Sequence, residues 1–303
     1  MAASEALPTR VGKPSLLRLI RDSKIAQGLT LIAPANAYLF VFMVVPLILV
    51  GVLSFLSRGD YGQVEFRFNL TNYTRLLDPL YARILGYSLV VGVATTVMSL
   101  VIGYPLAYYI ARAPARQRSL LLFLVLLPFW TNFIIRIYAW IMILRAGGFL
   151  DDVLQWAHIT TEPLRLLYTP TAVMIGMIYE FLPFMVLPLY TSLEKIENAV
   201  MEAAADLGAP PVQVFLRVTL PLSIPGMIAG TILVFIPAMG MFVIPDLMGG
   251  AKTILIGNVI RNQFLTARDW PFGAAASMIL MILTMVFTFY YARRAGLSEE
   301  LVV

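Results

Sequence analysis

The 303-residue sequence contains no cysteine and a single histidine, His158. Without cysteine the chain forms no disulfide, no thiolate metal site and no cysteine nucleophile. One histidine is also too few for a multi-histidine metal centre, so no metal site is expected.

Charged residues are scarce as well. They make up 13% of the chain, whereas a soluble protein carries about 25%. Hydrophobic residues make up 60%, against about 45–50% in soluble proteins, and the mean hydropathy is +0.83. This composition is typical of an integral membrane protein. In such a protein the net charge of +5 reflects lysine and arginine that set orientation, so no nucleic-acid partner is expected.

The apolar segments between charged residues predict six membrane-spanning helices. A spanning helix needs about 20 mostly apolar residues, because about 30 Å of hydrocarbon is crossed at about 1.5 Å per residue. The third predicted span passes Arg136, and the fourth contains Glu180. We therefore expect an all-α integral membrane protein with six transmembrane helices, at 29–56, 85–111, 119–143, 170–190, 222–244 and 271–292.

The two ends of the chain are expected in the cytoplasm. The apolar stretch after the basic N-terminal arm is about twice as long as the apolar core of a signal peptide, so it is expected to stay as the first span. Twelve lysines and arginines lie on the side of the termini, three of them in the short 112–118 connector, against nine on the other side. This bias places the arm (1–28) and the tail (293–303) inside, around a transmembrane domain at 29–292.

The connector between the fourth and fifth spans, residues 191–221, predicts a helix–turn–helix, which we call the elbow. Thr191 has capping-box spacing to the acid three residues later, which predicts a helix start. Gly208 is expected to end this helix, since glycine tolerates the left-handed conformation. Pro211 suits the first turn of a second helix, which is expected to end before Pro221.

The charge of the elbow favours a protein partner. Helices that lie on lipid are usually rich in lysine and arginine, and an amphipathic connector on the lipid surface is the alternative. The alanines after Glu202 let another surface approach closely, and the carboxylate can anchor an arginine. Acids outnumber bases, with Glu194, Glu197, Glu202 and Asp206 against Lys195 and Arg217.

The segment Glu202-Ala203-Ala204, then Gly208, then nine residues, then Val218-x-Leu220-Pro221 resembles the EAA motif. That motif belongs to permease subunits of bacterial ATP-binding-cassette (ABC) importers, which usually have isoleucine where Val218 stands. The resemblance implies the type I ABC importer permease fold and an elbow that inserts into a groove of a separate ATPase. The residues implied in this coupling are Glu202, Ala203, Ala204, Gly208, Leu220 and Pro221.

Further segments resemble the B-type permeases of spermidine/putrescine importers. They are the run from Ile236 to Gly250, Ile256-Gly-Asn, Asn262-Gln-Phe-Leu, Arg268-Asp-Trp-Pro-Phe-Gly, and the Arg136–Trp140 segment. The resemblance covers essentially the whole chain and is densest at 199–275. It implies a non-enzymatic subunit of the bacterial inner membrane, with ATP and magnesium bound by an ABC ATPase dimer and no cofactor on this chain. The other implied partners are a second homologous permease, an extracytoplasmic polyamine-binding protein and membrane lipid.

Glu180 is the first candidate for a cargo contact. A carboxylate near mid-bilayer costs about 2.5–3.5 kcal/mol, so it normally faces a cavity or a partner. Polyamines are extended ammonium chains, which carboxylates and aromatic faces hold, and Tyr179 is adjacent. The alternative is an ion pair with Arg136. The two residues differ in predicted depth by roughly 10 Å, which leaves both interpretations open.

The remaining candidates lie toward the outer face. Asp246 ends the fifth span and is either a cargo contact or part of a polar turn. Tyr138, Trp140, Asp269 and Trp270 are candidates for the same pathway, although tryptophan and tyrosine at a membrane surface often form an aromatic belt instead.

Two patterns concern helix packing. Gly226 and Gly230 form G-x-x-x-G, which lets helices approach closely, either within this chain or between two permeases. Pro128 is expected to kink the third span.

Other functions are less consistent with the sequence. The segment Gly249-Gly250-Ala251-Lys252-Thr253 superficially resembles a phosphate loop. It lacks the first glycine at the required spacing, and Lys252 is not preceded by glycine, so the chain is not expected to be an ATPase. A self-contained secondary transporter often shows inverted repeats, and none is evident. An ABC permease for another solute, such as a phosphonate or ferric ion, remains open, because Arg136 could serve an anion.

Overall fold

The computed structural model describes residues 24–160, 162–250 and 252–294. Contacts divide the chain into two compact units, Met1–Val52 and Leu53–Val303. The first unit contains most of helix α2 (Lys24–Ser54), an apolar helix with prolines inside it. Of the arm expected at 1–28 and the tail expected at 293–303, residues 1–23 and 295–303 lie outside the described residues.

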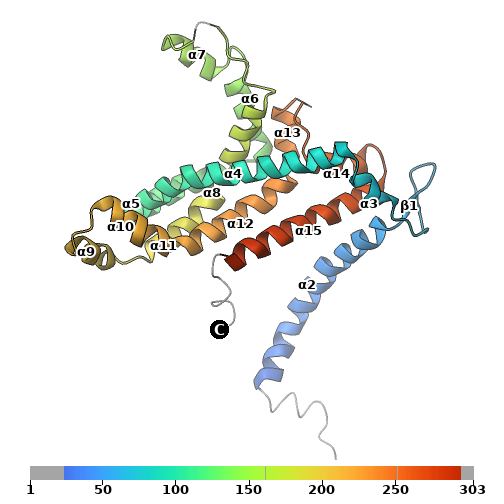
Figure 1. Ribbon diagram of the computed structural model, residues 1–303, viewed down its shortest axis with the longest axis horizontal. Coiled ribbons are helices and arrows are strands. Elements are labelled where there is room, and N and C mark those ends of the chain that lie inside the picture. Colours follow the sequence, from blue (N-terminus) through green and yellow to red (C-terminus); the bar gives the residue numbers. More distant parts are fainter. Residues whose placement is uncertain (1–23, 161, 251, 295–303) are drawn as a thin grey trace, which may run out of the picture. The chain divides into compact units, whose positions relative to one another are not determined.

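The second unit consists almost entirely of helices (Figure 1). It begins with a short antiparallel hairpin of β1 (Ser57–Arg58) and β2 (Val64–Glu65). The helices of its first half are α3 (Thr71–Leu76), α4 (Pro79–Arg112), α5 (Ala115–Leu126), the 3₁₀ turn η1 (Leu127–Trp130), α6 (Phe133–Leu144) and α7 (Phe149–Trp156). Those of its second half are α8 (Pro170–Glu194), α9 (Asn198–Asp206), α10 (Pro211–Val214), the π-helical turn η2 (Phe215–Thr219), α11 (Leu220–Leu222), α12 (Ile224–Gly240), α13 (Val243–Met248), α14 (Ile256–Leu265) and α15 (Trp270–Arg294).

Four of the six expected spans coincide with single long helices. The spans predicted at 29–56, 85–111, 170–190 and 271–292 are α2, α4, α8 and α15. Among the described residues, five helical segments are long and apolar enough to cross a membrane. There are six if the bent pair Pro211–Leu222 and Ile224–Gly240 counts as one span.

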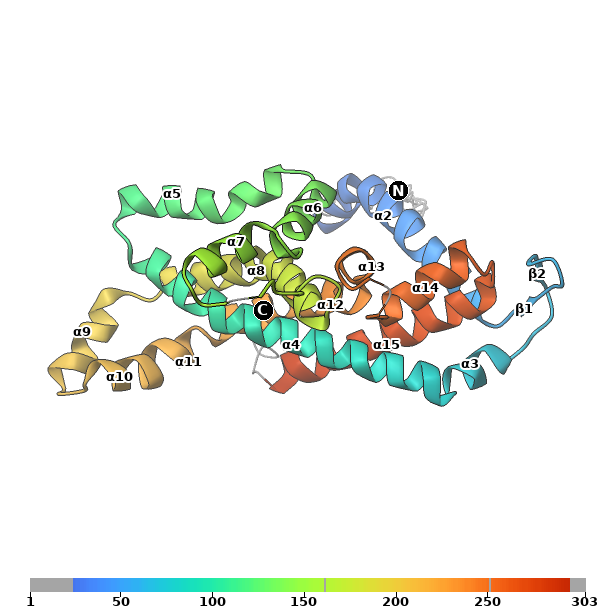
Figure 2. The ribbon, with the colours of Figure 1, turned by 90° about the horizontal axis from the view of Figure 1, so that it is seen from above.

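The third span was wrongly predicted as one helix over 119–143. Helix α5 ends at Leu126, and the 3₁₀ turn that contains Pro128 follows. Asn132 then starts a new helix, because its side chain accepts a hydrogen bond of 2.8 Å from the Ile134 N–H. Proline lacks the N–H that continues a helix, and asparagine is a strong N-cap, so the break has a local cause. Helix α6 leaves the line of α5 (Figure 2), and the apolar segment long enough to span is Phe133–Trp156.

The fifth span is also shorter than the predicted 222–244. Helix α12 ends at Gly240, and α13 starts a new turn at Val243.

Helices α4, α8 and α12 pack against one another and form the core of the second unit (Figure 1). Glycines allow the close approach. A Cβ on Gly226 would lie 2.5 Å from the Ser192 Cβ, and one on Gly230 would lie 2.7 Å from the Met185 sulfur, both on α8. The G-x-x-x-G pair therefore packs within this chain. The α8 side chains at the centre of the core are fully buried and include Met177, Met185, Val186 and Leu189.

We predict that Gly226→Ala destabilises the protein by about 1–3 kcal/mol, the usual cost of overpacking. The new Cβ would meet the Pro188 carbonyl oxygen at 2.7 Å, and a backbone atom cannot rotate away. The control is Gly86→Ala in α4, where nothing lies within 4 Å of the new Cβ. It should be neutral or slightly stabilising, because alanine favours helix. Thermal unfolding in detergent measures both, and equal unfolding temperatures would contradict the packing.

Candidate functional site

The elbow starts later than predicted. Helix α8 continues to Glu194, and the Thr191 hydroxyl donates to the Leu187 carbonyl at 3.0 Å instead of capping a new helix. The capping-box prediction at Thr191 is therefore wrong. The same spacing occurs inside a helix whenever tertiary packing continues that helix. Residues 195–197 form a short non-helical stem, and α9 begins at Asn198.

The turn of the elbow was predicted correctly. Helix α9 ends at Asp206, and Gly208 has a φ of +86°, the left-handed conformation expected of a residue that ends a helix. The Gly208 N–H donates to the Ala205 carbonyl at 2.8 Å. Pro211 is the first residue of α10, where its missing N–H costs nothing.

The second helix of the elbow does not end before Pro221 but continues through it to Leu222. The turn just before the proline is π-helical, with the Leu220 N–H bonded to the Phe215 carbonyl. Proline cannot donate to the carbonyl four residues back, and the widened turn is where the helix accommodates this loss. A bend of 61° then separates Pro211–Leu222 from Ile224–Gly240.

The outer surface of the elbow combines exposed apolar groups with a free carboxylate. Leu207 is 90% exposed and Val212 is 67% exposed. Glu202 is exposed and makes no hydrogen bond or ion pair with the described part of the chain. Of the other residues proposed for coupling, Ala203, Gly208 and Pro221 are exposed, whereas Ala204 and Leu220 are half-buried. Exposed apolar groups around an unpaired acid are suited to a protein partner that offers a base.

In the structure Glu180 is paired with Arg136, the ion pair that one of its two interpretations expected. The Arg136 Nη2 lies 3.1 Å from the Glu180 Oε1, and both side chains are about nine-tenths buried. The pair can form because α6 is a separate helix that approaches α8 and is not the continuation of α5. The Arg136 Nε and Nη1 are buried and have no hydrogen-bond partner among the described residues.

Two of the aromatic candidates lie beside this pair. The rings of Trp140 and Tyr179 meet edge-on with centroids 5.3 Å apart. The Arg136 guanidinium lies 5.0 Å from the centre of the Phe129 ring, within cation–π range. Tyr138 is 55% exposed and takes no part in these ring contacts. The α6–α8 contact thus gathers one acid, one base and aromatic rings, the groups that can hold an organic cation.

The two outer carboxylates are bound by other arginines. Asp246 on α13 accepts hydrogen bonds from the Asn258 amide and from the Arg261 Nη1, the latter at 2.7 Å. Asp269 is 2% exposed, lies 2.9 Å from the Arg75 Nη1, and accepts the Phe272 N–H at the start of α15.

These contacts give Asp269 a clear structural role as a helix cap, whereas Asp246 lies on a partly exposed pair. Trp270 is 48% exposed and faces Phe264. Within the described residues, no group of three or more acids or histidines lies close enough to hold a metal.

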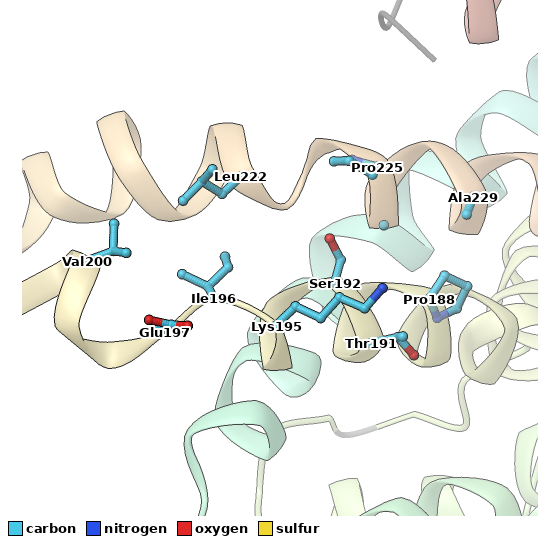
Figure 3. Close-up of a pocket in the computed structure, with 11 residues that line it drawn as sticks. Pro188, Thr191, Ser192, Lys195, Ile196, Glu197, Val200, Leu222, Pro225 and Ala229 are labelled. Atoms are coloured by element: carbon cyan, nitrogen blue, oxygen red, sulfur yellow. The ribbon is translucent and has the colours of Figure 1, made fainter. Parts of the chain in front are cut away.

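An open groove of about 690 Å³ lies beside the stem of the elbow (Figure 3). One wall is the end of α8, with Ser192 and Lys195, and the other is formed by Leu222 and Pro225.

Sequence reasoning used Arg112 and Arg118 only to count charges for orientation. In the structure Arg112 bonds Asn198 on α9, and Arg118 forms an ion pair with Glu194 at the end of α8. No pattern in a single sequence marks these contacts, because the bonded residues lie 76 and 86 positions apart.

The buried Arg136–Glu180 pair predicts that substitutions at its two positions have non-additive effects on the free energy of unfolding. Glu180→Met alone should cost about 3–5 kcal/mol, because it leaves the Arg136 charge unpaired in the interior. The double variant with Arg136→Met should recover most of that loss, since two apolar groups of similar volume replace the pair. Chemical or thermal unfolding in detergent measures both. In the partly exposed Arg261–Asp246 pair, Arg261→Met should cost only about 0–1 kcal/mol. Additive losses at positions 136 and 180 would argue against the pair.

Comparisons with known proteins agree on one family. Residues 99–296 match the family described as binding-protein-dependent transport system inner membrane component. The sequence is 48% identical over 263 residues to the spermidine/putrescine transport system permease protein PotB of Escherichia coli (strain K12). The match covers 87% of this chain and 96% of that protein.

Solved structures show the same fold. A bacterial ABC transporter involved in the import of the acidic polysaccharide alginate superposes with a TM-score of 0.71, at 17% identity, over 92% of this chain and 98% of that one. A second structure shows the bacterial alginate transporter in complex with an alginate pentasaccharide-bound periplasmic protein. It has a TM-score of 0.71 at 16% identity, over 93% of this chain and 98% of that one.

Proposed function

This chain belongs to the family of inner membrane components of binding-protein-dependent transport systems, and from that membership we propose that it is the permease subunit of a polyamine importer. The cargo would be spermidine or putrescine, and the chain would form half of the translocation pathway. The observation that carries the proposal is the 48% identity to a spermidine/putrescine permease, which extends over 87% of the chain. The chain is a multi-pass inner membrane protein with the type I ABC importer permease fold.

Energy would reach this chain through the elbow. We propose that the exposed face around Glu202 and Leu207 docks into a separate ABC ATPase dimer, which binds ATP and magnesium, and that this chain binds no cofactor. The exposed apolar groups and the unpaired Glu202 support this docking, because a water-exposed apolar surface is normally covered by a partner. Docking on lipid headgroups is less consistent with the excess of acid.

The other proposed partners follow from the family. They are a second homologous permease, an extracytoplasmic polyamine-binding protein and the surrounding lipid, with no nucleic acid. We propose both termini in the cytoplasm, with the arm at 1–28 and the tail at 293–303 flanking the transmembrane domain.

The cargo contact is proposed at the α6–α8 contact. A polyamine ammonium can replace the Arg136 guanidinium at the Glu180 carboxylate, while the Trp140 and Tyr179 rings offer faces to the cation. Asp246 and the exposed aromatics Tyr138 and Trp270 are proposed contacts nearer the outer side. Asp269 is a weaker candidate because a helix start and Arg75 already use its oxygens. An anionic cargo such as a phosphonate is disfavoured, because Glu180 neutralises Arg136.

We predict that Glu202→Lys uncouples ATP hydrolysis from uptake, since the reversed charge would repel the basic partner group that a carboxylate attracts. The variant should still insert in the membrane, because Glu202 makes no hydrogen bond or ion pair with the described residues that would stabilise the fold. Uptake and ATP hydrolysis are measured in liposomes that contain all subunits. Asp152→Lys in α7 is the control, because it reverses an exposed acid outside the elbow. Persisting uptake in the Glu202 variant would refute the coupling role.

We predict that Glu180→Gln lowers polyamine uptake at least about tenfold, since a lost charge-assisted contact is worth about 1.5–3 kcal/mol. Glutamine keeps the shape and one hydrogen bond to Arg136, so the fold should be retained. Competition by spermidine and putrescine against labelled cargo measures the change. Tyr109→Phe in α4 is the control, because Tyr109 is exposed and is not one of the proposed cargo contacts. Unchanged uptake would leave Glu180 with a structural role only.

A further inference from the structure

The first turn of α5 contacts the end of α8, just before the stem of the elbow, through Arg118. Its Nη1 lies 2.6 Å from the Glu194 Oε1, on the last residue of α8. Its Nη2 donates to the carbonyls of Ala111 and Ala113, at 3.0 and 3.3 Å. One guanidinium therefore joins the C-terminal end of α4 to the C-terminal end of α8.

Arg112 makes a second bridge to the other side of the stem. It is the last residue of α4, and its Nη1 donates to the Ile196 carbonyl at 3.2 Å and to the Asn198 Oδ1 at 2.8 Å. Ile196 is in the stem, and Asn198 is the first residue of α9. The bond crosses from a long core helix directly to the first helix of the elbow.

Guanidinium groups are well suited to hold the ends of two helices together. The free carbonyls at a helix C-terminus carry partial negative charge, which favours a cation there. The planar guanidinium can bind a carboxylate and backbone carbonyls at the same time, which an ammonium cannot do with the same geometry. The remaining donors, the Arg112 Nε and Nη2 and the Arg118 Nε, are buried beside a small polar cavity of about 210 Å³.

The arginine bridges lie near positions where the helical path of the chain is interrupted. Three non-helical residues join α8 to α9, and at the far end of the elbow the helix bends by 61° before α12. The stem also borders the open groove shown in Figure 3, where Lys195 and Glu197 line one wall without packing against Leu222. Within the elbow, the buried Thr219 donates to the Met201 sulfur at 3.8 Å, so its two helices are held together.

We propose that Arg112 and Arg118 are positioning residues that fasten the elbow, and the end of α8 that carries it, to the end of α4 and the start of α5. We call these contacts the clamp. A displacement of α9 is then delivered to α4 and α5, and not only along the chain to α8 and α12. The inference rests on the proposed function, because it assumes that a partner ATPase moves the elbow. Neither arginine touches ATP or cargo.

The first test compares Arg112→Ala and Arg118→Ala with Arg116→Ala in the complete transporter. Arg116 is exposed and makes no hydrogen bond or ion pair with the described residues, so it is a matched control two positions away. The two clamp variants should retain co-purification with the ATPase and its basal hydrolysis. Cargo transported per ATP hydrolysed should fall about 5- to 150-fold, the range of typical coupling between sites. Arg118→Lys should give an intermediate loss.

The second test measures motion in the otherwise unchanged chain. Because the sequence has no cysteine, Gln117→Cys and Ala205→Cys allow two spin labels at exposed positions of α5 and α9. The distance between the labels should be the same with and without ATP, since the clamp makes the two segments move together. Adding Arg112→Ala and Arg118→Ala should broaden that distance distribution. The first result of this measurement does not depend on whether an alanine variant folds.

The outcomes separate the two proposals. A complete wild-type transporter without ATP-driven polyamine uptake would refute the proposed function. A wild-type transporter that works, together with clamp variants that transport equally well per ATP, would refute only the clamp. A label distance that changes with ATP in the wild-type background would also overturn it.

Discussion

Close packing of α4, α8 and α12 is the constraint on which the other features depend. Inside a bilayer the hydrophobic effect does not drive helices together, so small residues and close contact must do so. Gly226 and Gly230 bring α12 against α8, and Gly103 brings α4 against the same helix, where a Cβ would lie 3.2 Å from Met185. The common partner, α8, carries Glu180 within the membrane region and ends at Glu194 beside the elbow. The proposed cargo contact and the elbow are therefore attached to one continuous helix.

Three carboxylates of this fold are paired with arginines. The carboxylates of Glu180, Asp246 and Asp269 each lie within 3.1 Å of an arginine nitrogen. A buried pair costs much less than a lone charge, but its desolvation is only partly repaid, so such pairs rarely persist for stability alone. Arg136 still has two buried nitrogens without a partner among the described residues. The α6–α8 pair is the one of the three in which both side chains are about nine-tenths buried.

The elbow has a tight turn in its interior, a non-helical stem at one end and a bend at the other. Gly208 and Pro211 shape its turn, and the π-helical turn before Pro221 lets the second helix run on toward α12. Its attachments to α8 and α12 are a three-residue stem and a bend. A displacement of the elbow reaches the core helices only through these two attachments unless further contacts hold it. Arg112 and Arg118 supply that hold by hydrogen bonds to helix-end carbonyls, a carboxylate and an amide.

The sequence by itself determined the membrane class, most of the spans and the turn of the elbow. These features depend on local chemistry: runs of apolar residues, a glycine at positive φ and a proline at a helix start. The break of the third span also has a local cause, Pro128 and Asn132, although the apolar pattern predicted one continuous helix. Tertiary structure decided the continuation of α8 past Thr191. It also decided the pairing of Arg136 with Glu180 and the two arginine bridges. Those outcomes depend on which side chains meet across helices far apart in sequence, and the strength of a hydrogen bond or ion pair is set by that distance and burial, which a linear pattern does not contain.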